Sequence, residues 1–168
     1  MKQRSLKSRA LQLLAQRDQS RLELRRKLLR SLQRDARAVE AGSAPDGESD
    51  GESDRGRAEA EVEALLDWLA GHGFLSDERF VESRVHARAP RFGNLRIRNE
   101  LAQHGVTLPA ELQGTLAESE LARAAAVRER RFPALPGSPA ERAAQMRFLA
   151  GRGFSPEVIH RLLRRRPA

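Results

Sequence analysis

The side chains with the strongest chemical character in this 168-residue chain are basic: 31 Lys and Arg stand against 23 Asp and Glu. Their distribution is uneven. Residues 1–40 carry 12 basic against 4 acidic side chains, residues 41–78 carry 2 against 11, and residues 79–168 carry 17 against 8. Two basic regions that flank an acidic one predict a polyanion, or an acidic protein surface, as the partner.

No pattern suited to catalysis or metal binding accompanies these charges. None of the four histidines is followed by a second ligand three or four residues later, and the sequence contains no cysteine, so we expect no zinc site. The sequence shows no Gly-rich phosphate loop, Ser/His/Asp set or paired carboxylates, and the Asp-Glu-Arg-Phe run at 77–80 is interpreted as a helix start. We therefore predict a protein that is not an enzyme and uses no cofactor.

The segment 42–56, GSAPDGESDGESDRG, contains no large apolar residue. Such a segment cannot bury enough apolar surface to offset its ordering entropy, so we predict a disordered acidic loop. Its alternating oxygen-bearing side chains lack the spacing and the terminal Glu of an EF-hand, so a specific calcium site is not expected.

Helical periodicity covers the rest of the chain. Apolar spacing together with start and stop signals predicts nine helices and no strand, an all-α protein. The expected helices include 5–16, one that starts at Ser20, 57–72, 94–104, 107–117 and 118–131. No apolar run approaches the roughly 18 residues of a membrane span, and the N-terminus lacks a signal-peptide core, so we expect a cytoplasmic protein.

Two internal matches indicate a repeat. LAGHGF (69–74) recurs as LAGRGF (149–154), and SRLELRRKL (20–28) aligns with GNLRIRNEL (93–101). A unit of this length cannot bury its apolar face alone, so neighbours must stack. We expect an elongated, curved array of three three-helix repeats, at 1–74, 75–117 and 118–168. The residues expected to hold the repeats together by packing are Leu24, Leu28, Phe74, Phe80, Ile97 and Leu101.

Four segments of the chain resemble the RecX family of regulatory proteins, which modulate the RecA recombinase. They are RALQLLAQRDQSRLELRRKL (9–28), GHGFLSDERFVESRVHAR (71–88), FGNLRIRNELAQHGV (92–106) and RFLAGRGFSPEVIHRLL (147–163). The combination of GFLSDERF with RIRNEL at this separation is the most specific part. This sequence departs from the family pattern where Phe74 and Phe92 replace tyrosines, and in its acidic segment. The family fold, three tandem three-helix repeats, agrees with the array expected from periodicity.

The resemblance implies a protein that lies in the groove of the RecA filament on single-stranded DNA. It also implies contact with adjacent protomers and restraint of ATP hydrolysis, strand exchange and co-protease activity, within DNA repair and the SOS response. Two alternatives fit the residues: a direct, largely non-sequence-specific binder of single-stranded or duplex DNA, and a helical-repeat scaffold for another protein. In each case we expect a monomer.

The candidate contact residues fall into three groups. Four lie opposite the apolar face of the helix that starts at Ser20, where they form either a solvated face or a stripe that faces phosphate or the filament. Three surround the start of the helix at 94–104, where Arg96 could instead pair with Glu100. The others lie in the basic C-terminal tail. The candidates are Arg26, Lys27, Arg30, Arg34, Arg88, Arg91, Arg96, Arg161, Arg164 and Arg165.

Two further arginines, Arg25 and Arg98, occupy matching positions of the repeat. Both are expected within the apolar arc of their helices, where a charge must pair or extend to water. We interpret them as structural residues that hold a helix end or a buried carboxylate.

Overall fold

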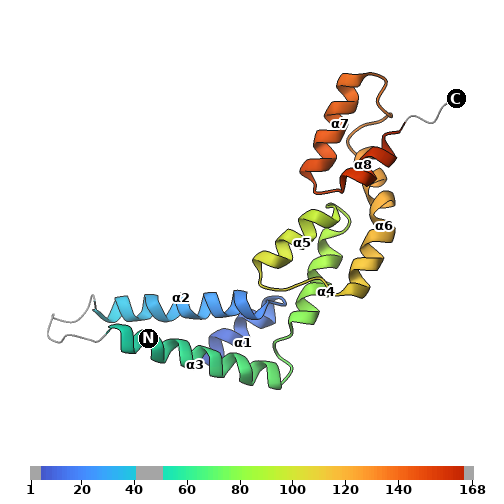
Figure 1. The fold of residues 1–168 in the computed structure, drawn as a ribbon. Helices are drawn as coiled ribbons and strands as arrows, with labels where there is room; N and C mark the ends of the chain where they lie inside the picture. The colour runs from blue at the N-terminus through green and yellow to red at the C-terminus, as the bar shows by residue number, and fades with distance from the viewer. Residues whose placement is uncertain (1–4, 41–50, 165–168) are drawn as a thin grey trace. The chain divides into compact units, whose positions relative to one another are not determined.

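The computed structural model describes residues 5–40 and 51–164, and this part of the chain is all-α, as predicted (Figure 1). It forms tandem helical repeats without a strand. The chain divides into two compact units, Met1–Phe80 and Val81–Ala168. The helices are α1 (Leu6–Gln16), α2 (Arg21–Glu40), α3 (Gly51–Gly71), α4 (Asp77–Arg88), α5 (Asn94–Gln103), α6 (Ala110–Glu129), α7 (Pro139–Gly151) and α8 (Pro156–Leu162).

The first unit is built around α2 and α3, which lie side by side with α1 packed against them (Figure 1). Leu24 and Leu28 of α2 are fully buried against Val62, Leu66 and Leu69 of α3. The spacing of four between Leu24 and Leu28 places both on one face of the helix. The expected core of this unit is therefore present.

The second unit contains most of α4 and all of α5 to α8. Ile97 and Leu101 of α5 have no exposed surface, and Leu149 and Phe154 form a separate core cluster with the C-terminal half of α6. Phe80, at the end of the first unit, is also buried. The helix α6 contacts α5, α7 and α8, so it serves two successive repeats.

The chain from 110 to 129 is one helix, whereas the sequence predicted two, at 107–117 and 118–131, and nine in all. No proline interrupts this stretch, and Gly114 costs only about 1 kcal/mol in a helix. Buried Leu116, Glu120, Ala124 and Val127 continue one face across the predicted break. That continuous packing face outweighs the glycine, so the repeat boundary predicted between residues 117 and 118 falls inside α6.

The acidic segment was predicted as a loop over 42–56, but residues 51–56 belong to α3. The N-terminal turn of a helix favours negative charge, which Asp54 supplies, and no proline opposes helix formation here. Residues 42–50 lie outside the described residues.

Three helices end in the same backbone motif. After α3, Phe74 N–H donates to Leu69 O at 2.9 Å, and Gly73 N–H donates to Ala70 O at 3.0 Å. The same pair of bonds closes α5 at 101–106 and α7 at 149–154. This Schellman pattern requires a left-handed residue, and Gly73, Gly105 and Gly153 have φ of 74°, 72° and 80°. The repeated glycines of the sequence thus mark repeated helix ends.

In the second unit, Glu120 of α6 joins the N-termini of two helices. Its buried carboxylate accepts hydrogen bonds from the backbone N–H of Asn94 at 3.0 Å and of Ser155 at 3.2 Å, and from Ser155 Oγ at 3.1 Å. These N–H groups have no partner within their own helices, and the helix dipoles favour a negative charge there. Glu120 therefore fixes α5 and α8 to α6.

One turn further along α6, Arg123 holds the end of α4. Its guanidinium donates to the carbonyl oxygens of Ala89 at 3.1 Å, Phe92 at 2.7 Å and Leu116 at 3.0 Å, and to Asn94 Oδ1. Burial lowers the pKa of Arg123 from its ordinary value. Its donors satisfy carbonyl groups at a helix end that the helix itself leaves free.

Candidate polyanion-binding surfaces

A basic groove lies between α1 and α2 in the first unit. It encloses roughly 610 Å³, and Leu13 and Leu28 form part of its lining. No carboxylate of the described residues lines it. The polar lining consists of Arg9, Gln12, Gln16, Lys27, Arg30, Ser31, Gln33, Arg34 and Arg37. With five cations and three amide side chains, the groove suits an anionic partner.

Several of these cations already have partners. Arg9 donates to Ser31 Oγ at 3.1 Å and pairs with Asp35. Lys27, predicted as a contact residue, pairs with Glu23 at 2.9 Å and donates to Gln19 Oε1 at 2.9 Å. Their charge is therefore partly used within the protein.

Glu23 is the centre of one of these ion-pair networks. It accepts hydrogen bonds from Arg17 and Lys27. Burial alone would raise the pKa of Glu23, but the two cations outweigh burial and lower the pKa to about 2. Glu23 is therefore ionised at neutral pH, and Lys27 is less available to a partner than the sequence suggested.

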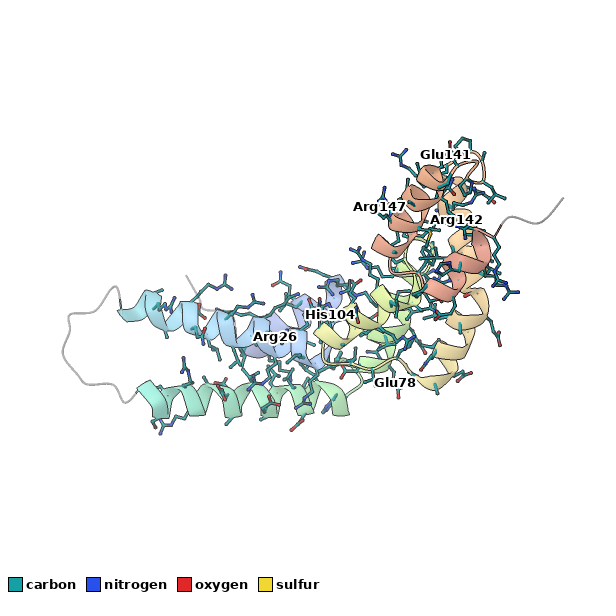
Figure 2. All side chains as sticks on the ribbon, turned by 45° about the horizontal axis from the view of Figure 1, so that its top comes forward. Arg26, Glu78, His104, Glu141, Arg142 and Arg147 are labelled. Carbon is teal, nitrogen blue, oxygen red and sulfur yellow. The ribbon has the colours of Figure 1, made fainter. Side chains whose placement is uncertain are left out.

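Arg30 and Arg34 remain available, and Arg37 joins them. Arg30 Nε donates to Arg26 O within the helix at 3.1 Å, and its guanidinium pairs with no carboxylate in the described part of the chain. Arg34 and Arg37 are exposed and make no ion pair within the described residues. The contact residues predicted from the sequence did not include Arg37, although it follows Arg34 by three residues on the same helix. Arg26 is exposed on α2 but does not line the groove (Figure 2).

Arg25 lies against acidic side chains of α3. Its Nε is 2.6 Å from Glu63 Oε1, and its guanidinium reaches Glu59 at 3.6 Å. Arg21 pairs with the same Glu63 at 2.7 Å and with Asp67 at 2.8 Å. The hydrogen bonds from Arg21 and then Arg25 lower the pKa of Glu63. These ion pairs join α2 to α3.

Arg98 differs from its repeat counterpart, and its predicted position in the apolar arc is wrong. It is exposed and forms no ion pair in the part of the chain that the structure describes. The buried face of the short α5 contains Asn94, Ile97 and Leu101, and this narrow strip leaves position 98 outside.

In the second unit, Arg88 pairs with Glu100 of α5. Arg88 Nε and a terminal nitrogen donate to Glu100 Oε1 at 3.0 and 2.8 Å, and Arg84 lies 3.3 Å from the same oxygen. The alternative pair between Arg96 and Glu100 is not formed. Arg96 instead lies over the ring of Phe92, with 4.3 Å from Cζ to the ring centroid. Arg88 therefore links α4 to α5, while Arg96 forms no ion pair with any described residue.

The remaining predicted contact residues lie at the surface. Arg91, Arg161 and Arg164 are exposed, and Arg165 lies outside the described residues. Phe74, predicted as a packing residue, is 48 % exposed and stacks on Trp68 at 5.8 Å between ring centroids. Its repeat counterpart Phe154 is buried.

No helix among the described residues combines the length and the apolar character needed to cross a membrane. Residues 5–40 and 51–164 also bring together no group of three or more His, Asp or Glu side chains that could hold a metal ion.

Comparison with known proteins identifies the family. Two family models match the chain: the second three-helix domain of RecX at residues 76–107, and the third three-helix domain of RecX at residues 118–163. The Regulatory protein RecX of Ralstonia nicotianae is 46 % identical over 161 residues, which cover 95 % of this chain and 86 % of the relative. Those of Herbaspirillum seropedicae and Leptothrix cholodnii are 45 % and 43 % identical over 92 % and 96 % of this chain, and 86 % and 89 % of the relatives. The chain therefore belongs to the RecX family.

Proposed function

We propose that this protein binds the RecA filament on single-stranded DNA and modulates RecA, mainly by inhibiting ATP hydrolysis, strand exchange and co-protease activity. Membership of the RecX family carries this proposal, because 46 % identity extends over 95 % of the chain. In this proposal the protein acts as a cytoplasmic monomer without catalytic activity of its own. Its three repeats are 1–74, 75–117 and 118–168, with the last boundary inside α6.

The groove between α1 and α2 is the surface of the first unit that we assign to the filament. Three of the arginines that line it have no carboxylate partner within the described residues: Arg30, Arg34 and Arg37. Each Lys or Arg that neutralises a DNA phosphate releases bound counterions, so such contacts strengthen binding most at low salt. The same charges would also suit an acidic surface of RecA.

The proposal is tested by measuring the ATPase activity of RecA on single-stranded DNA in the presence of substoichiometric protein. We expect inhibition that persists when the protein is far less abundant than RecA. A protein that binds DNA tightly without RecA and leaves the ATPase rate unchanged would instead be a direct DNA-binding protein. The scaffold alternative predicts neither effect.

A pair of charge-matched variants tests the groove. Replacing Arg34 and Arg37 with Gln removes two groove charges, whereas replacing Arg55 and Arg57 with Gln removes two exposed charges of α3 outside the groove. We expect the first variant to need roughly tenfold more protein for half-maximal inhibition, since a groove that neutralises fewer phosphates binds more weakly and with a lower salt dependence. Equal inhibition by the two variants would remove the groove from the interface.

A further inference from the structure

Four arginines surround one small pocket in the second unit. The pocket has a volume of roughly 250 Å³ and is lined by Arg91, Val127, Arg130, Arg131, Phe148 and Arg152. No carboxylate lines it, and none of the four guanidinium groups forms an ion pair within residues 5–40 and 51–164. Four like charges therefore converge here, and no carboxylate of the described residues balances them.

The ends of three helices bring these arginines together. Arg91 lies in the turn after α4, where its N–H donates to Arg88 O at 3.0 Å. Arg130 is the C-cap of α6, and Arg152 is the C-cap of α7. The backbone of Arg152 is fixed because its carbonyl oxygen accepts a hydrogen bond from Gly93 N–H at 3.0 Å. A cation at a helix C-terminus is favourable on its own. The helix dipoles account for each arginine singly, but not for the convergence of four on one pocket.

Aromatic rings hold two of the guanidinium groups without neutralising them. Arg152 Cζ lies 5.1 Å from the ring centroid of Phe148 and 5.8 Å from that of Phe92. Arg131 Cζ lies 5.7 Å from the ring centroid of Phe132, which meets Phe148 edge-on at 5.4 Å. A cation–π contact orients the guanidinium plane and leaves its N–H groups free to donate to an oxyanion. The pocket is therefore preorganised for an anion with several oxygens.

A buried arginine follows the lining residue Val127 along α6. Arg128, in the last turns of α6, is 6 % exposed, and its Nε and one terminal nitrogen have no hydrogen-bond partner in the described structure. Its nearest carboxylate, Glu129, lies 3.6 Å away and is itself largely exposed. A cation this poorly neutralised favours an anion nearby.

We propose that this pocket binds a phosphate group of a single-stranded nucleic acid backbone. Its volume equals that of about eight water molecules at ~30 Å³ each, enough for a phosphate group but too small for a folded element of another protein. Several guanidinium groups from separate segments match the oxygens of a phosphodiester, which arginine recognises by paired N–H donors. The proposal that the bound strand is the single-stranded DNA of the RecA filament rests on the proposed function. The proposal that the pocket binds a phosphate group does not.

The test is binding of a fluorescein-labelled oligothymidylate to the full chain without RecA, followed by fluorescence anisotropy over a series of salt concentrations. The variant replaces Arg91 and Arg130 with Gln, since both side chains are exposed and neither makes an ion pair in the described residues. The control replaces Arg98 and Arg147 with Gln, which removes the same charge from exposed positions of α5 and α7 that do not line the pocket. Circular dichroism melting verifies that both variants are folded.

We expect the R91Q/R130Q variant to bind about tenfold more weakly, with a salt slope smaller by about 0.7 for each phosphate that the variant no longer neutralises. The control should change affinity much less. Equal decreases in affinity in the two variants would overturn the proposal, because net charge alone would then explain binding. Tighter binding of labelled oligoglutamate than of oligothymidylate, abolished in the pocket variant, would also overturn it in favour of an acidic protein segment.

A competition arm separates the two sources of phosphate. Inorganic phosphate at constant ionic strength that displaces the oligonucleotide from the wild type, but not from the pocket variant, would support a site that takes free phosphate as well. A variant effect without such competition would support a site that needs the nucleic acid strand. Since these measurements contain no RecA, their failure would leave the proposed function standing, and the ATPase assay tests that separately.

Discussion

Replacing Gly153 with Ala is expected to loosen the third repeat. Gly153 has φ of 80°, and a Cβ at this position would lie 2.4 Å from the Cβ and 2.7 Å from the backbone nitrogen of Arg96. An L-residue in the left-handed region costs roughly 1–2 kcal/mol, and forcing a methyl group into a packed contact costs about 1–3 kcal/mol more. The free energy of unfolding of the second unit should therefore fall by about 2–5 kcal/mol.

Substitutions at two other glycines of the repeat separate the cost of backbone strain from the cost of the steric clash. Gly73 has φ of 74°, but an added Cβ would meet nothing within 4 Å, so Gly73→Ala should cost only the roughly 1–2 kcal/mol of backbone strain. Gly151, the last residue of α7, also has open space around it and lacks a positive φ. Gly151→Ala should be neutral or stabilise by up to about 1 kcal/mol.

The assay is hydrogen–deuterium exchange on peptides from α5 to α8 and from α3, because Gly153 and Gly73 lie in different units. Gly153→Ala should increase exchange in α5 and α7 well beyond the increase that Gly73→Ala causes in α3. If both variants show the same increase, the close approach of the 151–153 turn to Arg96 does not hold in solution. That result would also contradict the backbone hydrogen bond from Gly93 N–H to Arg152 O, which fixes one arginine of the pocket.

Three further outcomes follow from the structure. The pKa of Glu23 is about 2 in the folded protein and about 4.3 in the unfolded chain. The ionised carboxylate therefore stabilises the fold fully above about pH 5, and this contribution is lost as the pH falls toward 2. In urea denaturation, the difference in the free energy of unfolding between wild type and Glu23→Gln should shrink over that pH range. Glu120→Ala should cost roughly 3 kcal/mol because it leaves two helix N-termini without their acceptor, and Glu120→Gln, which keeps one acceptor, should cost less in the same denaturation. If α6 is one continuous helix, Gly114→Ala should increase the free energy of unfolding by up to about 1 kcal/mol and raise the melting temperature. An unchanged melting temperature would indicate a break in the helix.

Helix ends could be predicted from the sequence because their signals are local. Gly73 and Gly105 each follow an apolar helical pattern at its end, and the backbone motif that requires them spans only six residues. The length of α6 could not be predicted in this way. Its continuity depends on a buried face that α5, α7 and α8 cover, and those helices lie elsewhere along the chain.

The availability of each arginine was harder to predict, because ion pairs connect different helices. Arg88 looked free on its own helix, but its partner Glu100 lies 12 residues further along the chain, on α5. Lys27 is a different case, because its partner Glu23 stands four residues earlier on α2 and this spacing alone indicates the pair. Arg25 and Arg98 match in the repeat alignment, yet only Arg25 has a carboxylate opposite it, on α3. A repeat alignment preserves position on the helix, not the charge of the neighbour.

The pairing between α2 and α3 also changes the meaning of the acidic region. Glu59, Glu63 and Asp67 recur every four residues along one face of α3, and two of them meet the guanidinium of Arg25 while two meet that of Arg21. These carboxylates are therefore interface residues of the first unit as much as a negative surface. Among the basic side chains of residues 1–40, Arg21 and Arg25 hold α2 on α3. Of the cations that line the groove toward α1, Arg9 and Lys27 are paired within the protein, whereas Arg30, Arg34 and Arg37 have no carboxylate partner among the described residues. Removing these three arginines should weaken binding without loosening the α2–α3 pair, and removing Arg21 or Arg25 should do the reverse.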